Sequence, residues 1–182
     1  MIGNIGFGIL VITFLLSLFG VGAALYGGLK QSARWVESAR LSMLLTFPLL
    51  SLVSIALIIL LVTGQYQYEF VYGVTSNSMP LYLKITALWG GQAGSLVFWS
   101  WLLSAFVSAV TLRKWERDRE FLPWVIVVAL VTVAFFLIMV IFFENPFIRF
   151  WIAPTGQSAA MFAPAGGVEI RPPDGNGLNP LL

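Results

Sequence analysis

Cysteine and histidine are both absent from the 182 residues of the chain. Without cysteine, the chain can form neither a disulfide nor a thiolate metal site. Without histidine, it lacks the side chain that most often serves as a general base and as a haem or metal ligand. Any such chemistry would therefore depend on groups from a partner or from further sequence.

Charge is also scarce, since 10% of the residues are charged and 59% are hydrophobic. The mean hydropathy is +0.91, whereas about a quarter of the residues of an average soluble domain are charged. This composition predicts an all-α integral membrane protein that contacts the lipid bilayer. The net charge of +2 is small, and the basic residues lie in short loops between apolar runs, so we expect no nucleic-acid partner.

Four stretches without charged residues are long enough to cross a hydrocarbon core of about 30 Å. We predict four transmembrane helices within residues 1–143, a region that we treat as one domain. The first charged residue, Lys30, follows the first apolar run, which favours a retained helix over a cleaved signal peptide. The predicted spans are about 5–29, 41–64, 88–112 and 124–143.

The basic residues are distributed unevenly along the chain, and seven of the ten fall in the loops after the first and third predicted helices. The positive-inside rule places these two loops in the cytoplasm. We therefore expect both termini to be extracytoplasmic. The charged run at 113–120 is interpreted as a solvated loop. The seven residues are Lys30, Arg34, Arg40, Arg113, Lys114, Arg117 and Arg119.

Two further segments are predicted to lie outside the membrane. Aromatic residues alternate at period two within residues 65–72, a pattern typical of an extended segment with an aromatic face. Residues 144–182 contain many prolines and glycines and no apolar run of spanning length. We expect this second segment to be an irregular extracytoplasmic tail.

The stretch 79–99 combines a polar turn with tryptophan and glycine at the start of the third predicted helix. Small residues four apart, such as Gly90 and Gly94, let a helix approach another helix or a flat ligand closely. The two tryptophans and the glutamine of the stretch would project from one face of that helix. Spacing alone favours a packing face with interfacial tryptophans over a binding site. The candidate cofactor-binding residues are Trp89, Gly90, Gly91, Gln92, Gly94, Ser95 and Trp99; no catalytic residue or metal ligand is predicted.

Several separated motifs together resemble the N-terminal part of the CcmF-type cytochrome c haem lyases, a family of haem-handling membrane proteins. The resemblance covers essentially the whole chain in order. The motifs are Ser76-Asn77, Pro-Leu-Tyr-Leu-Lys at 80–84, Trp-Gly-Gly-Gln-Ala-Gly-Ser-Leu-Val-Phe-Trp at 89–99, Asn-Pro-Phe at 145–147 and Gly-Leu-Asn-Pro-Leu-Leu at 177–182.

The resemblance implies a multi-pass protein of the bacterial inner membrane that takes haem from a carrier and helps attach it to apocytochrome c on the outer side. It implies four kinds of partner: a haem chaperone, apocytochrome c, thiol-reducing biogenesis subunits and the remaining half of the haem lyase. Family members are much longer, with their tryptophan-rich segment and haem-ligating histidines downstream of the position of Leu182. We therefore expect an N-terminal piece that does not ligate haem by itself.

Two positions depart from the pattern that the resemblance implies. Thr75 stands where many relatives have histidine, and Gln92-Ala93 stands where many have His-Glu. None of these residues is a usual ligand of haem iron. Trp89 and Trp99 could stack on a porphyrin and Gln92 could bind a propionate, with helix packing as the alternative.

Two other functions fit the composition: a small membrane transporter or channel subunit, and a structural membrane assembly factor. Ion pathways usually place a charged residue inside a spanning helix, and the four predicted cores contain none. Whether the chain is an enzyme stays open, because it resembles a haem lyase yet lacks the histidine-bearing region.

Overall fold

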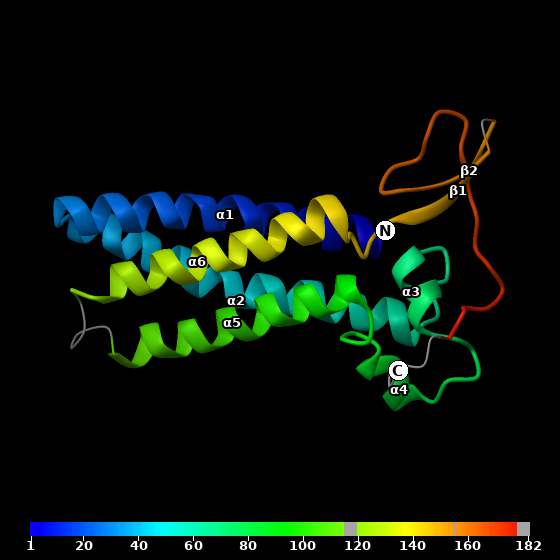
Figure 1. Cartoon of the computed structure of the whole chain (residues 1–182), viewed down its shortest axis with the longest axis horizontal. Coiled ribbons are helices and arrows are strands. Elements are labelled where there is room, and N and C mark those ends of the chain that lie inside the picture. Colours follow the sequence, from blue (N-terminus) through cyan, green and yellow to red (C-terminus); the bar gives the residue numbers. More distant parts are fainter. Residues whose placement is uncertain (115–119, 155, 178–182) are drawn as a thin grey trace.

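Four long helices lie side by side in the computed structural model, which describes residues 1–114, 120–154 and 156–177 (Figure 1). Each is long and apolar enough to cross a membrane, so the prediction of four spanning helices is confirmed for the described part of the chain. The helices are α1 (Ile2–Lys30), α2 (Ala33–Val62), α5 (Gln92–Lys114) and α6 (Leu122–Ile138), and α6 continues into the π-helix η1 (Met139–Phe143).

The second helix begins at Ala33, well before the predicted start at residue 41. Gln31 takes a left-handed conformation with φ of 51°, and the N–H of Ser32 donates to the Gly27 carbonyl, so a very short turn joins α1 to α2. The predicted polar loop is therefore mostly helical. Its charges are accommodated because Arg40 pairs with Glu37 at 3.0 Å, one turn apart on α2.

Glycines let α1 pack closely against its neighbours. A Cβ placed on Gly20 would meet Leu130 of α6 and Ser42 of α2. A Cβ on Gly27 would lie 2.7 Å from the backbone nitrogen of Val36. In a membrane, such small residues allow backbones to approach, and close fit holds the helices together.

The short elements gather at one end of the bundle, near the N-terminus (Figure 1). The antiparallel sheet has the strand order β2-β1-β3. The α1–α2 turn and the adjoining ends of α5 and α6 lie at the opposite end. We call the first end the sheet end and the second the basic end. The short elements are α3 (Glu69–Val74), α4 (Leu81–Thr86), β1 (Arg149–Ala153), β2 (Gly156–Ala160) and β3 (Val168–Glu169).

Two sequence predictions at the sheet end are wrong. The aromatic segment 65–72 is not an extended strand, since Tyr68 makes one isolated bridge to Arg149 and α3 begins at Glu69. Its aromatic side chains are largely buried, so packing between distant segments overrides the local alternation. The segment after Phe143 is not wholly irregular, because β1 buries Trp151 and pairs with two other strands.

The predicted solvated loop at 113–120 cannot be compared in full, because residues 115–119 lie outside the described part of the chain. The third helix begins at Gln92 and not at residue 88. The fourth begins at Leu122, two residues before the predicted start, with Pro123 in its first turn.

Candidate functional site

The predicted Gly90 and Gly91 lie in the turn before α5 and not inside a helix. The N–H of Gly90 donates to the Ala87 carbonyl at 3.1 Å, the bond that closes a four-residue turn. The expected helix face with small residues four apart is therefore wrong. Only Gly94 and Ser95 of the small residues lie in α5, in its first turn, where the Ser95 hydroxyl donates to the Trp89 carbonyl at 2.7 Å.

These glycines hold the turn against α3. A Cβ on Gly91 would lie 2.8 Å from Val74, and one on Gly94 would meet the Leu88 carbonyl and lie 2.5 Å from the Phe70 ring. The Leu88 carbonyl near Gly94 belongs to the backbone and shifts less easily than the Val74 side chain near Gly91. Gly94 is therefore the more constrained of the two positions. The close approach thus joins the start of α5 to α3, and no spanning helix is the neighbour.

A polar cleft of about 360 Å³ opens between α3, the start of α5 and the end of η1. Glu69 and Glu144 contribute carboxylates, and Gln92 and Asn145 contribute amides. The cleft joins two motifs that are far apart in the sequence, the Trp-Gly-Gly-Gln stretch and the Asn-Pro-Phe stretch. We call it the polar cleft; its oxygen atoms suit cationic or hydrogen-bond-donating groups.

Asn145 and Phe147 fix one wall of this cleft. The Asn145 side-chain oxygen accepts a hydrogen bond of 2.9 Å from the Phe147 N–H. Phe147 is fully buried and packs where a Cβ on Gly6 would otherwise stand. The π-helix η1 ends directly before this turn, and π-helical turns are frequent at functional sites.

A second cavity, of about 260 Å³, lies on the other side of the α5 start, between α2, α4 and α5. The ring centroids of Trp89 and Phe98 are 5.4 Å apart, and those of Phe98 and Trp101 are 5.9 Å apart. We call this the aromatic cavity. Trp101 was not among the predicted site residues, although its position three residues after Phe98 places both rings on one helix face.

The structure separates the three side chains that were predicted to share one face. Gln92 lines the polar cleft, whereas Trp89 lines the aromatic cavity. Trp99 lines neither and is 59% exposed on the outside of the bundle. The prediction of one shared face is wrong for Trp89, because α5 begins only at Gln92 and Trp89 precedes it.

Residues 171–177 run back across the sheet end and dock beside α3; we call this segment the strap. The N–H of Asn77 donates to the Asp174 carboxylate at 2.7 Å, and its side-chain amide donates to the Pro173 carbonyl at 3.0 Å. The N–H of Gly177 donates to the Thr75 carbonyl at 3.2 Å. The Ser76-Asn77 motif therefore anchors the strap, and of the motif at 177–182 only Gly177 is described.

Thr75 and Tyr66 lie beneath the strap. The Thr75 side chain is fully buried and donates to the Val71 carbonyl at 2.8 Å, so it faces the core and lines none of the cavities described here. The Tyr66 hydroxyl donates to Asn77 at 3.0 Å. Burial raises the pKa of Tyr66, and the nearby Asp174 carboxylate raises it further, while Arg171 acts in the opposite direction.

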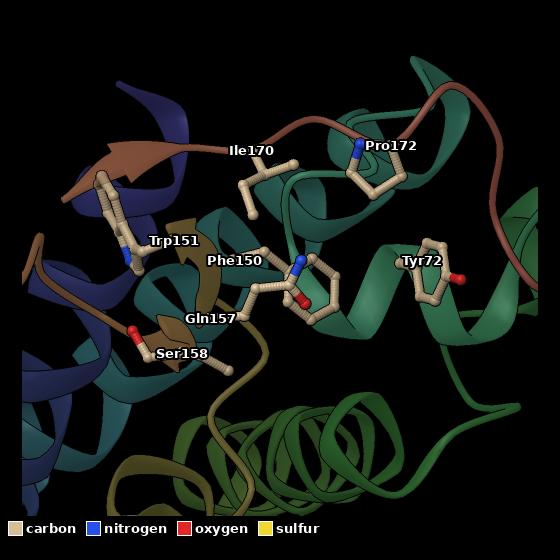
Figure 2. A pocket seen from close by; sticks show the side chains of 8 residues that line it. Tyr72, Phe150, Trp151, Gln157, Ser158, Ile170 and Pro172 are labelled. Atoms are coloured by element: carbon tan, nitrogen blue, oxygen red, sulfur yellow. The ribbon is translucent and has the colours of Figure 1, made fainter. Parts of the chain in front are cut away.

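The sheet encloses a third cleft, of about 400 Å³, between its strands and α3 (Figure 2). Phe150 and Gln157 lie close together near its middle, while Tyr72 of α3 and Pro172 of the strap lie at one end. The Tyr72 and Phe150 rings meet edge to face at 5.5 Å. No sequence motif pointed to this cleft, because the sequence predicted no sheet.

Arg149 ties the sheet to the bundle. Its guanidinium donates to the side chain of Asn4 at 3.0 Å, lies 3.6 Å from the Glu169 carboxylate and sits 4.9 Å from the centre of the Trp151 ring. One side chain thus connects α1, β1 and β3. The sequence did not predict this role, because Arg149 appears there only as a single basic residue after an apolar run.

The donor groups present do not fit an iron-ligated haem. The chain has no histidine or cysteine, and no group of metal-ligating residues occurs among the described residues. Met43 is fully buried in the packed helices, and the exposed Tyr82 would be an unusual axial ligand. The aromatic cavity is lined by apolar and aromatic side chains and two serines, none of which is a usual ligand of haem iron.

Taken together, the four apolar helices and the sheet end define a multi-pass membrane protein with two distinct recesses beside the start of α5. No family model matches the chain. Its whole length is 27% identical to the cytochrome c-type biogenesis protein CcmF of Haemophilus influenzae and 26% identical to the protein of that name in Escherichia coli. In each comparison the chain spans about a quarter of the relative's length, 26%.

A solved structure described as the cytochrome c haem lyase CcmF shares this fold. The two superpose with a TM-score of 0.70 over 80% of this chain and 24% of the other, at 23% identity. The resemblance seen in the sequence motifs is therefore confirmed: the chain is similar to an N-terminal CcmF-type region.

Proposed function

We propose that the chain serves in cytochrome c maturation, as the N-terminal portion of a protein that delivers haem and attaches it to apocytochrome c. The observation that carries the proposal is similarity along the entire chain to proteins named for cytochrome c-type biogenesis. The chain spans about a quarter of their length, so the activity would require the remaining portion of the haem lyase.

We further propose a location in the bacterial inner membrane, with the sheet end outside and the basic end in the cytoplasm. The basic residues at 30–40 and the ends of α5 and α6 lie at one end of the bundle, which supports this orientation. The sheet end would then face the compartment in which apocytochrome c, the haem chaperone and the thiol-reducing subunits act.

Within this function, we assign positioning roles to the predicted site residues. Gly91 and Gly94 would hold the α5 start against α3 and so shape the polar cleft. Trp89 would contribute an apolar wall, Gln92 a hydrogen-bonding group, and Trp99 an exposed surface for the remaining portion of the haem lyase. Haem itself would be ligated by groups outside this chain.

A transporter or channel and a purely structural assembly factor remain as alternatives without a specific observation in their favour. The polar cleft lies at the sheet end, among α3, η1 and the first residues of α5. No charged residue lies within residues 41–68 or 85–112, which argues against an ion pathway through these helices.

Depletion of the chain in the cells that produce it tests the proposed function. We expect covalent haem staining of c-type cytochromes to fall while b-type cytochromes, which hold haem without thioether bonds, keep their spectra. Normal c-type staining after complete depletion would contradict the proposal. Equal loss of both cytochrome types would indicate a general defect of haem supply or of the membrane.

A further inference from the structure

The aromatic cavity presents carbon to its interior. Its walls include Ile55 and Ile58 of α2, Leu88 after α4, and the Trp89 and Trp101 rings. The Ser51 hydroxyl at its floor donates to the Phe47 carbonyl at 2.8 Å and accepts a hydrogen bond of 2.8 Å from Trp101. These two groups are satisfied within the protein, and the Ser54 hydroxyl, which has no hydrogen-bond partner among the described residues, is buried. The other lining side chains are apolar or aromatic, so the cavity suits a hydrocarbon group.

The cavity opens on the outer surface of the helix bundle. Ile55 is 52% exposed and Trp89 is 48% exposed, although both line it. In a membrane this surface meets lipid tails and not water. A groove left unfilled would lose dispersion contacts along its walls, so a flexible chain that enters it is favoured.

A positive charge lies close to this cavity. Lys84 of α4 directly precedes Ile85, a residue that lines the cavity. Lys84 forms no ion pair with any residue that the structure describes. Trp89 lines the same cavity, and tryptophan is enriched at the level of lipid headgroups.

We propose that the aromatic cavity binds one acyl chain of an anionic glycerophospholipid, whose phosphate lies at Lys84. The Lys84 ammonium group favours this occupant, since a phospholipid carries an anionic phosphate next to its hydrocarbon chains. A neighbouring spanning helix could enter the cavity only with its side chains, and it would need an acidic residue to pair with Lys84. This inference does not depend on the proposed role in cytochrome c maturation.

Native mass spectrometry of the purified chain, titrated with palmitoyl-oleoyl phosphatidylglycerol or with phosphatidylcholine bearing the same acyl chains, tests the proposal. We expect one phosphatidylglycerol per chain, bound about fivefold more tightly than phosphatidylcholine, the effect of one lysine near an anionic headgroup. Lys84→Gln should equalise the two lipids. Lys30→Gln, at the basic end, should preserve the difference.

A pair of neighbouring positions on α2 provides the steric control. Ile58→Trp should fill the cavity and abolish stoichiometric binding, whereas Ile59→Trp, on the exposed side of the same helix, should bind like the original chain. Circular dichroism establishes that both variants are folded. Equal affinity of the original chain for the two lipids, or unchanged binding by folded Ile58→Trp, would overturn the proposal.

Photo-crosslinking identifies the occupant in the membrane itself. With p-benzoylphenylalanine in place of Ile85, another wall of the cavity, we expect an adduct with the mass of a phospholipid. An adduct to another polypeptide, or to a second copy of the chain, would show that protein covers the site and would overturn the lipid assignment.

Discussion

The backbone N–H of Asn77 donates a 2.7 Å hydrogen bond to the Asp174 carboxylate, although 97 residues separate the two in the chain. The same carboxylate oxygen accepts from the Gly175 N–H, so Asp174 both caps its own turn and docks it. The strap is thereby fixed beside α3, whose other side packs against Gly91 and Gly94 at the start of α5. Through α3, the strap and the polar cleft belong to one packed unit.

Asp174→Ala should loosen the strap without unfolding the helices. The substitution removes an acceptor from two backbone N–H groups, and because the site is exposed we expect a cost of about 1 kcal/mol. Hydrogen exchange at the amides of Asn176 and Gly177, which also bond to the body of the protein, should become about fivefold faster. Glu120→Ala, an exposed carboxylate at the basic end, is the control, and equal exchange in the two variants would refute the docking role.

Strap docking should weaken at high pH because of Tyr66. Its folded pKa is raised above the ordinary value of 10.0, first by burial and then by Asp174. A group with a raised folded pKa stabilises the folded state below its unfolded pKa, and this contribution is lost as the pH rises through the folded pKa. Exchange of the strap amides, corrected for intrinsic rates, should rise above about pH 10. Tyr66→Phe should remove that rise, and an identical pH profile in the variant would contradict the assignment.

Gly94→Ala should destabilise the start of α5. The added methyl group would collide with the Leu88 carbonyl and the Phe70 ring, and overpacking of this kind costs about 1–3 kcal/mol. Gly22→Ala in the spanning helix α1 is the matched control, because nothing lies within 4 Å of the methyl group that it adds. Thermal unfolding in detergent measures the difference, and equal midpoints for the two variants would show that the close approach is unimportant.

Single cysteines at Ser32 and Ser158 should react differently with a membrane-impermeant maleimide in intact cells whose outer membrane has been permeabilised. The chain has no other cysteine, so each variant reports one position. With the sheet end outside, the cysteine at 158 should react and the one at 32 should be protected until the inner membrane is opened. The reverse pattern would invert the proposed orientation.

The spanning helices could be predicted from the sequence because an uncharged run of sufficient length has few alternatives in a bilayer. Their ends could not, since Arg40 and Glu37 satisfy each other within α2 and so let the helix extend through a charged segment. The sheet escaped prediction because its contacts with the bundle, such as that of Arg149 with Asn4, join residues far apart in sequence. The motif predicted which residues form the candidate site. It did not predict that Gln92 lines the polar cleft while Trp89 lines the aromatic cavity, because spacing alone does not reveal the turn at Gly90.

The central claim is that the chain takes part in cytochrome c maturation, and rescue of depleted cells tests it most directly. The measurement is the ratio of haem-stained to total reporter cytochrome c, normalised to the amount of membrane-inserted chain. The original chain should restore the ratio, Gly94→Leu should fail to do so, and Trp89→Ala should insert normally yet restore it only in part. A ratio that is the same with and without the original chain would contradict the account.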